Sequence, residues 1–138
     1  DGDANDGEHR TFMQMLPTAW QYARLPLYNM MNNQDLFLAT SVDASESVRI
    51  QATLHCLWLA DNGDLLYGGG GANLKEQQFG FTGTSLTTQS IGSLVDMMIN
   101  YQATPSVAMS LYTGHLFSSD TVLRGGQTYG FFEVVTKF

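Results

Sequence analysis

The chain has 138 residues, which is enough for one hydrophobic core and too few for two ordinary domains. Apolar residues make up 43% of it and charged residues only 14%, against roughly 25% in a typical soluble domain. The net charge is −7, and the six basic residues are spread along the chain, which argues against a nucleic-acid footprint or binding to an anionic membrane surface. Uncharged polar residues must therefore supply most of the surface, which favours a β domain.

The number of cysteines and the length of the apolar runs narrow the class of protein further. Cys56 is the only cysteine, so the chain has no internal disulfide and no cysteine-rich zinc site, and its strand-like surroundings favour a packing role. No apolar run reaches the length of about 18 residues that a membrane helix needs, and no signal-peptide pattern is present. We expect no membrane insertion. Because the chain begins with Asp, we expect a processed piece of a larger protein.

Residues 1–10 are polar, acidic and punctuated by glycine, and we interpret them as a flexible linker before a single domain over residues 11–138. Calcium binding is the alternative, because the acidic start supplies hard oxygen ligands at Asp1, Asp3, Asn5 and Asp6. An EF-hand loop would need Gly at its sixth position and Glu at its twelfth, where this chain has Asp6 and Phe12. We therefore expect no obligatory cofactor.

The first half of the domain begins irregularly. Residues 12–16 fit an edge strand, and residues 18–33, interrupted by Pro26, predict a long loop with a helical turn. A strand follows at 36–40 and a turn at 43–47. Residues 47–60 alternate clearly and predict a long strand. Asn62-Gly63 then predicts a hairpin that returns through residues 64–67.

The second half opens with a glycine run at 68–71. Short strands are expected at 79–82 and 85–88. Residues 93–101 predict a two-turn helix, with Ser93 as its cap and Asp96 at the third helical position. Strands are expected at 106–113 and 127–138, and because the last of them is apolar on both sides we expect it in a central, buried position of the sheet. The pattern predicts an all-β fold, an antiparallel β-sandwich or barrel, with a jelly-roll-like sandwich and one or two short helical turns as the first choice.

No catalytic centre is recognisable. His9, His55 and His115 lack a metal-ligand spacing, and we expect His55 to be an exposed or hydrogen-bonded strand residue. The serines near Gly83 and Gly92 lack the nucleophile-elbow pattern. We predict that the chain is not an enzyme; a glycosidase or a jelly-roll metal enzyme assembled from scattered residues is the least favoured alternative.

Aromatic and methionine residues gather in two segments. Charge-poor patches of this kind occur in subunit interfaces, although a hydrophobic lid over the core is the more ordinary interpretation. The candidate partner interface consists of Trp20, Tyr22, Tyr28, Met30, Met31, Met97, Met98 and Tyr101.

An acidic hinge followed by a β domain whose last strand reads Gly126 to Val135 resembles the protruding (P) domains of small icosahedral RNA virus capsids of the tombusvirus and nodavirus type. The resemblance implies a structural viral protein on the virion surface that forms a homodimer or other homo-oligomer and attaches to a host receptor or glycan. The alternative is an extracellular carbohydrate-binding module or lectin-like domain, in which Trp20, Tyr22, Trp58 or Tyr112 would stack on sugar rings.

Overall fold

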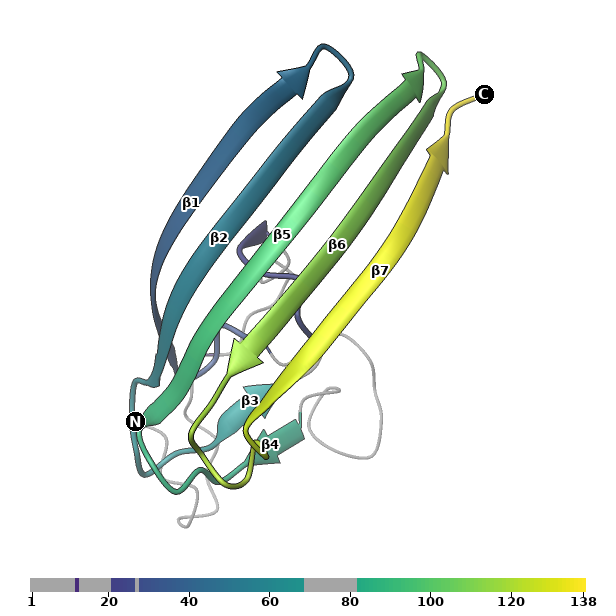
Figure 1. Cartoon of the computed structure of the whole chain (residues 1–138). Helices are drawn as coiled ribbons and strands as arrows, with labels where there is room; N and C mark the ends of the chain where they lie inside the picture. Colours follow the sequence, from purple (N-terminus) through teal and green to yellow (C-terminus); the bar gives the residue numbers. More distant parts are fainter. Residues whose placement is uncertain (1–11, 13–20, 27, 69–81) are drawn as a thin grey trace.

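The computed structural model describes residue 12 and residues 21–26, 28–68 and 82–138. In this part, seven strands form two antiparallel sheets (Figure 1). The smaller sheet pairs β3 (Leu66–Gly68) with β4 (Thr82–Thr84). The predicted all-β, antiparallel fold is confirmed. The larger sheet has the order β1 (Asn33–Ser45), β2 (Val48–Leu59), β5 (Ser90–Thr104), β6 (Val107–Phe117) and β7 (Gly126–Thr136).

The larger sheet is an up-and-down meander into which the β3–β4 pair is inserted, between β2 and β5. This order differs from the jelly-roll topology that we expected. Two-residue turns join β1 to β2 and β5 to β6 at one end of the sheet, which we call the turn end. The longer connections, residues 60–65, 85–89 and 118–125, lie at the opposite end, the loop end (Figure 1).

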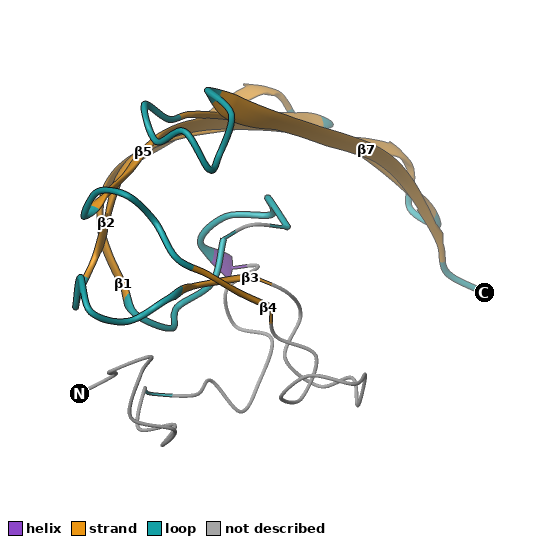
Figure 2. Cartoon of the chain, turned by 90° about the horizontal axis from the view of Figure 1, so that it is seen from below, coloured by secondary structure: helices purple, strands orange, loops and turns teal. Residues whose placement is uncertain are grey.

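The larger sheet is strongly curved, and other parts of the chain fill its concave side (Figure 2). The β3–β4 pair faces this concave side, which is the sandwich-like feature of the fold. Residues 21–26 and 28–32, which we call the inner segment, also lie there and include a helical turn at residue 21. The predicted loop with a helical turn before β1 is therefore observed in the described residues.

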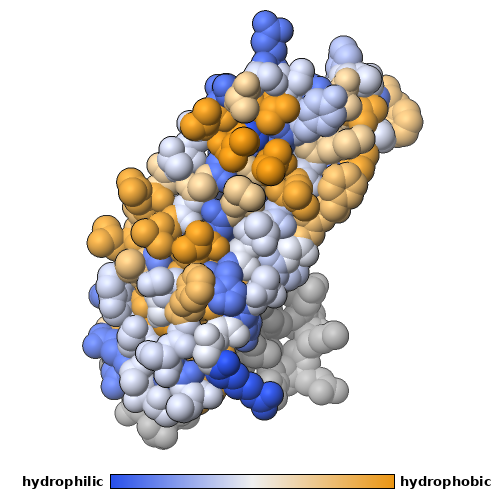
Figure 3. Space-filling view, viewed as in Figure 1, coloured by the Kyte–Doolittle hydropathy of each residue, from blue (hydrophilic) through white to orange (hydrophobic). Residues whose placement is uncertain are grey.

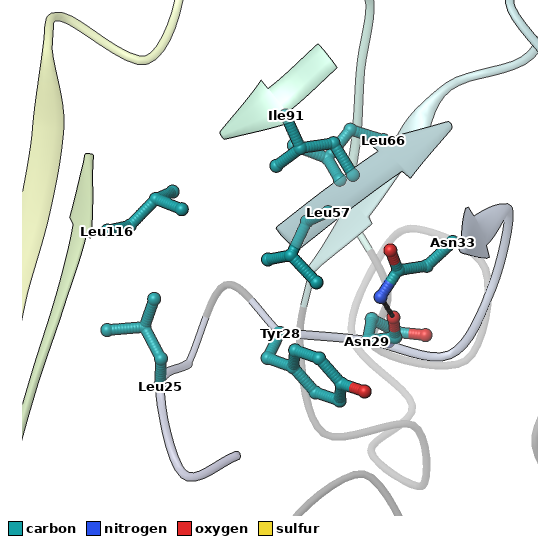
Figure 4. A pocket seen from close by; sticks show the side chains of 8 residues that line it. All are labelled: Leu25, Tyr28, Asn29, Asn33, Leu57, Leu66, Ile91 and Leu116. Carbon is teal, nitrogen blue, oxygen red and sulfur yellow. Dashed lines mark hydrogen bonds between the residues drawn. The ribbon is translucent and has the colours of Figure 1, made fainter. Parts of the chain in front are cut away.

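The hydrophobic core lies between the inner segment and the loop end of the sheet. Leu25 and Tyr28 from the inner segment pack with Leu57, Leu94 and Leu116 from three strands of the sheet. Figure 4 shows the apolar side chains at this place pointing toward one another, with a hydrogen bond from Asn33 Nδ2 to the Asn29 carbonyl oxygen beside them (2.9 Å). Toward the turn end the concave side chains become mostly partly buried or exposed.

The helix predicted at residues 93–101 is wrong, because this segment belongs to β5, the longest described strand. Leu94, Asp96 and Met98 point to the concave face, whereas Val95 and Met97 point to the convex face. Apolar residues therefore occur on both faces. That continuous apolar character hid the two-residue period and was mistaken for the start of a helix.

The predicted hairpin between residues 47–60 and 64–67 is also wrong, although its turn exists. Gly63 N–H donates to Asp61 Oδ1 at 2.8 Å, as the sequence suggested. However, β2 already pairs with β1 on one edge and β5 on the other, so no edge is left for β3, which pairs with β4.

Several other expectations had mixed outcomes. Residues 85–88 form a loop rather than a strand. The strands expected at 36–40, 106–113 and 127–138 correspond to β1, β6 and β7. The linker at 1–10, the strand at 12–16 except Phe12, and the strand at 79–82 except residue 82 lie outside the described residues.

Gly92 allows β5 and β6 to approach each other where the register of β2 and β5 shifts. Its φ of 137° is a conformation that favours glycine, and a Cβ placed there would lie 2.1 Å from the Phe117 carbonyl oxygen. Gly125 provides a comparison, because it also has a positive φ of 82° but nothing lies within 4 Å of its would-be Cβ.

Gly92→Ala should therefore destabilise the protein by about 2 kcal/mol or more, since it adds a backbone clash to backbone strain. The control Gly125→Ala should cost only the strain, about 1 kcal/mol. Chemical denaturation of both variants measures the difference. Equal costs would show that the contact with Phe117 does not constrain the sheet.

Candidate functional site: the two faces of the curved sheet

The convex face of the larger sheet is apolar along most of its length. Every second residue of each strand points to this face, and the register aligns these residues into rows across the sheet. Figure 3 shows this face, with hydrophobic side chains gathered near the turn end and over the β1–β2 side of the sheet, and more polar side chains between these two groups. Its large exposed apolar residues are Leu36, Leu38, Val42, Leu54, Trp58, Val95, Met97, Tyr101, Leu111, Phe117, Phe132 and Val134.

The exposure on this face is too large for a protein surface that meets water. Leu38 is 73% exposed and Phe132 is 64% exposed, although they lie in long, regularly paired strands. Soluble monomers rarely expose continuous apolar patches of this extent, and such a patch marks contact with a protein or with a membrane. The convex face is therefore a candidate contact surface.

The concave face carries polar, charged and aromatic side chains. Toward the turn end, Arg49 forms an exposed ion pair with Asp43 (2.7 Å). Farther along the concave face, Tyr112 stacks on Phe131, with ring centroids 5.3 Å apart, and the Arg24 guanidinium lies 5.7 Å from the centroid of the Phe131 ring. The polar residues of this face include Asn33, Asp35, Ser41, Asp43, Arg49, Gln51, Thr53, His55, Asp96, Asn100, Gln102, Ser110, Gln127 and Glu133.

His55 lies in the middle of β2 on the concave face, and its side chain is completely buried. Its Nδ1 is 2.8 Å from Asp35 Oδ2 in β1, and its Nε2 is 3.7 Å from Asp96 Oδ2 in β5. The second distance suits an ion pair but is too long for a hydrogen bond, and Nε2 has no hydrogen-bond partner among the described residues. His55 thus sits between two carboxylates.

Both carboxylates also connect to the inner segment. The Tyr28 hydroxyl donates to Asp35 Oδ2 at 2.8 Å. The Tyr112 hydroxyl donates to Asp96 Oδ2 at 3.3 Å and accepts from the backbone N–H of Arg24 at 3.1 Å. Burial, and then the hydrogen bond to Asp35, raise the pKa of Tyr28 above its usual value, so its hydroxyl keeps its proton. The polar chain runs through Tyr28, Asp35, His55, Asp96, Tyr112 and the backbone of Arg24.

Asp120 joins two connections at the loop end. Its side chain is 1% exposed, and its Oδ2 accepts hydrogen bonds from the backbone and hydroxyl of Thr87 and from the backbone of Thr88. Its Oδ1 accepts from Val122 N–H at 2.8 Å. Burial alone would raise the pKa of Asp120, but these donors outweigh it and hold the pKa below its usual value.

The structure does not bring the predicted interface residues together. Met97 and Tyr101 are exposed on the convex face, whereas Met98 points to the concave face. Tyr28 and Met31 are buried, Met30 is partly buried and Tyr22 is exposed against Phe37. Trp20 lies outside the described residues. Self-association therefore stays a prediction, and no single patch carries it.

The predicted calcium ligands Asp1, Asp3, Asn5 and Asp6 lie outside the described residues, so calcium binding there also stays a prediction. Within the described residues, no group of three or more His, Cys, Asp or Glu side chains could hold a metal ion. In the same part of the chain, no helix has the length and apolar character to cross a membrane.

The polar chain around His55 was not predicted from the sequence. His55 was expected to be an exposed or hydrogen-bonded strand residue, and it is hydrogen-bonded but buried. Its strand parity placed it opposite the apolar residues of β2, which was a usable signal. The partners come from other strands, so only the register could reveal them.

An antiparallel sheet with an exposed apolar face and a more polar opposite face defines a class of β protein whose sheet contacts a protein or a membrane on one side. The comparison with protein families agrees with this class: the alginate export family matches residues 1–135, and the chain belongs to this family. It is a family of outer-membrane β-barrel proteins. No curated protein and no solved structure matches the chain.

The family assignment corrects the functional predictions. The resemblance to a viral capsid protruding domain is wrong, and so is a virion-surface location. The lectin-like alternative is not supported either. The physical error lay in the last strand, whose apolar residues on both sides were interpreted as a central, buried position. Phe132 and Val134 instead point out from the exposed convex face.

Asp120→Asn should lower the melting temperature at neutral pH, because the amide cannot replace a carboxylate that accepts four hydrogen bonds. The contribution is present above the ordinary Asp pKa and is lost as the pH falls through the lowered pKa of Asp120. The difference between variant and wild type should therefore shrink in acid.

Calorimetry across this pH range measures the effect, and Glu133→Gln is the control, because Glu133 is an exposed carboxylate. A difference for Asp120→Asn that persists unchanged in strong acid would contradict the assigned role of the carboxylate charge.

Proposed function

We propose that the five-stranded sheet is part of the membrane-spanning wall of an outer-membrane transport protein. In this arrangement the convex face contacts lipid and the concave face borders the transport path. The observation that carries the proposal is the alternation along β1, β2 and β5, mainly apolar toward the convex face and largely polar toward the concave face beyond the core at the loop end, together with the exposed apolar residues that β6 and β7 add to the convex face. Transmembrane β-strands alternate in this way between lipid and a polar interior.

The height of the apolar surface supports the proposal. On β6 the convex residues run from Phe117 to Val107, ten residues apart, which corresponds to about 33 Å along the strand. A tilt of about 40° would reduce this length to about 25 Å across the membrane, which is the height of the apolar band in outer-membrane strands. Trp58 and Tyr101 lie near opposite ends of the band, where interfacial aromatic residues are common.

The free edges of the sheet favour the same arrangement. β1 and β7 are its outermost strands, with 13 and 11 residues. Unpaired backbone groups in lipid cost several kcal/mol each, so strands span membranes only when both edges are paired. We therefore expect both edges to pair with further strands in the intact protein.

The connections suggest an orientation. Outer-membrane proteins have short turns on the periplasmic side and longer loops outside. The two-residue turns after β1 and β5 would then face the periplasm, and the loop end with its packed core would face outward. This arrangement replaces our earlier expectation of no membrane insertion.

The charge of the concave face limits the role that we assign to it. Four acids (Asp35, Asp43, Asp96 and Glu133) face this side from the strands, against the single guanidinium of Arg49, which is already paired with Asp43. Alginate is itself anionic, so these strands alone do not form an attractive surface for it. The proposal gives them the role of wall rather than of substrate-binding site, and no enzymatic role.

Adjacent methionines on opposite faces test the proposal. Met97→Arg would place a charge near the middle of the lipid-facing band and should destabilise the membrane-inserted protein by about 2–4 kcal/mol. Met98→Arg, its neighbour on the concave face, should cost clearly less, because its charge can remain hydrated.

Urea unfolding of the intact protein in lipid vesicles measures both variants. Equal costs in vesicles, or a larger cost for Met98→Arg, would contradict a convex face that contacts lipid.

A further inference from the structure

We infer that Asp35, His55 and Asp96 form a proton-operated clasp that holds the inner segment against the concave face of the sheet. The clasp stands on the geometry of the described residues and does not require the proposed function. Its consequence for transport does rest on that function, because the inner segment fills the concave side at the loop end.

The imidazole ring of His55 lies between the carboxylates of Asp35 and Asp96. Asp35 Oδ2 accepts from both the Tyr28 hydroxyl and His55 Nδ1, each at 2.8 Å. Across the ring, Asp96 Oδ2 lies 3.7 Å from Nε2. Two carboxylates buried on either side of one imidazole need a positive charge between them, because an uncompensated buried charge is costly.

The protonated and neutral forms of the His55 ring differ in the hydrogen bonds that they can donate. Protonated His55 carries an N–H at each nitrogen and can serve both carboxylates. Neutral His55 keeps one N–H, so one nitrogen presents a lone pair to a carboxylate. Nε2 is completely buried and has no hydrogen-bond partner among the described residues, so no described group replaces the lost interaction.

Both carboxylates are connected to the inner segment by hydrogen bonds. Tyr28 binds Asp35 directly, and Tyr112 links Asp96 to the backbone N–H of Arg24. These two contacts lie four residues apart on the inner segment. When the ring loses its charge, the carboxylates should take up more water, and their largely buried position means that fuller hydration requires the segment to move away.

The surroundings of His55 define what else can titrate. Among the described residues, the titratable or charged groups that face the clasp are Asp35 from β1, Asp96 from β5, Tyr112 from β6, and Tyr22, Tyr28 and Arg24 from the inner segment. The tyrosine hydroxyls act as donors to the carboxylates, and the Arg24 guanidinium lies over Phe131 rather than against the clasp. His55 is therefore the group that changes charge near neutral pH.

The other end of the inner segment is fixed by different contacts. Asn32 Nδ2 donates to the carbonyl oxygens of Asp61 and Leu65, and Asn32 Oδ1 accepts from Asp61 N–H at 2.7 Å. None of these groups titrates near neutral pH. We therefore expect the segment to loosen at Arg24 and Tyr28 while it stays attached at Asn32.

Hydrogen exchange at the Arg24 and Tyr28 amides of the intact protein tests the clasp. After correction for the intrinsic pH dependence of exchange, both amides should exchange about tenfold faster or more at about pH 8.5 than at about pH 5.5, because histidine loses its proton in this range. His55→Gln should remove this pH response. His115→Gln is the matched control, since His115 lies on the convex face and bonds to Thr128; it should behave as wild type.

A wild-type protein with pH-independent exchange at these amides would overturn the clasp, and so would loss of the response in His115→Gln. If His55→Gln does not fold, the ring ¹⁵N signals of wild-type His55 decide the question. They should show loss of a ring proton over the same pH range as the exchange; an unchanged ring would overturn the proposal. The permeability of vesicles that contain the protein is a separate measurement. If amide exchange depends on pH but permeability does not, the result counts against the proposed function and leaves the clasp standing.

Discussion

The structure depends on one constraint: the two faces of the same strands carry opposite polarity. Because side chains alternate along a strand, β1, β2 and β5 satisfy this constraint locally, and the antiparallel register aligns the exposed apolar residues of β6 and β7 with their convex face. The consequence is a sheet that cannot hide its apolar face by folding on itself. Its apolar contact must come from outside the described residues, and in the proposed arrangement a lipid bilayer provides it without any specific partner.

The concave side of the sheet is covered at the loop end by other parts of the same chain. At the loop end, the inner segment and the β3–β4 pair cover the leucines of the sheet and form the only hydrophobic cluster of any size among the described residues. Carboxylates and a histidine are buried beside this cluster, so the packing and the polar chain are formed by the same segment. Apolar burial supplies most of the attraction there, and the polar chain makes that attraction sensitive to charge.

The sequence predicted the strands better than their environment. The alternation around Val48 to Trp58 correctly placed β2, and the patterns of β6 and β7 were also recognised. The error came from assuming that an apolar strand face must be buried inside the protein. Once Val95, Met97 and Phe132 are assigned to a lipid-facing surface, residues 93–101 become a strand and the last strand is no longer a buried one.

The candidate site could be predicted only in part. The parity of β2 placed His55 opposite its apolar residues, but Asp35 and Asp96 approach it because of the pairing of β1 and β5 with β2. The turn at Asp61 to Asp64 was also recognised, whereas the pairing of β3 with β4 depends on which strand edges are already occupied. Local sequence patterns were enough to predict most strands, whereas the residues around His55 are brought together by the pairing of strands that are distant in the sequence.

The most direct test of the central claim is the environment of two positions on the same strand. Nitroxide labels would be placed at Leu54→Cys and Gln51→Cys in a Cys56→Ser background of the intact protein in vesicles. Leu54 is 46% exposed on the convex face, and Gln51 is exposed on the concave face. The account predicts that oxygen dissolved in lipid relaxes the label at 54, whereas a water-soluble nickel chelate relaxes the label at 51. Efficient relaxation of the label at 54 by the nickel chelate would contradict it.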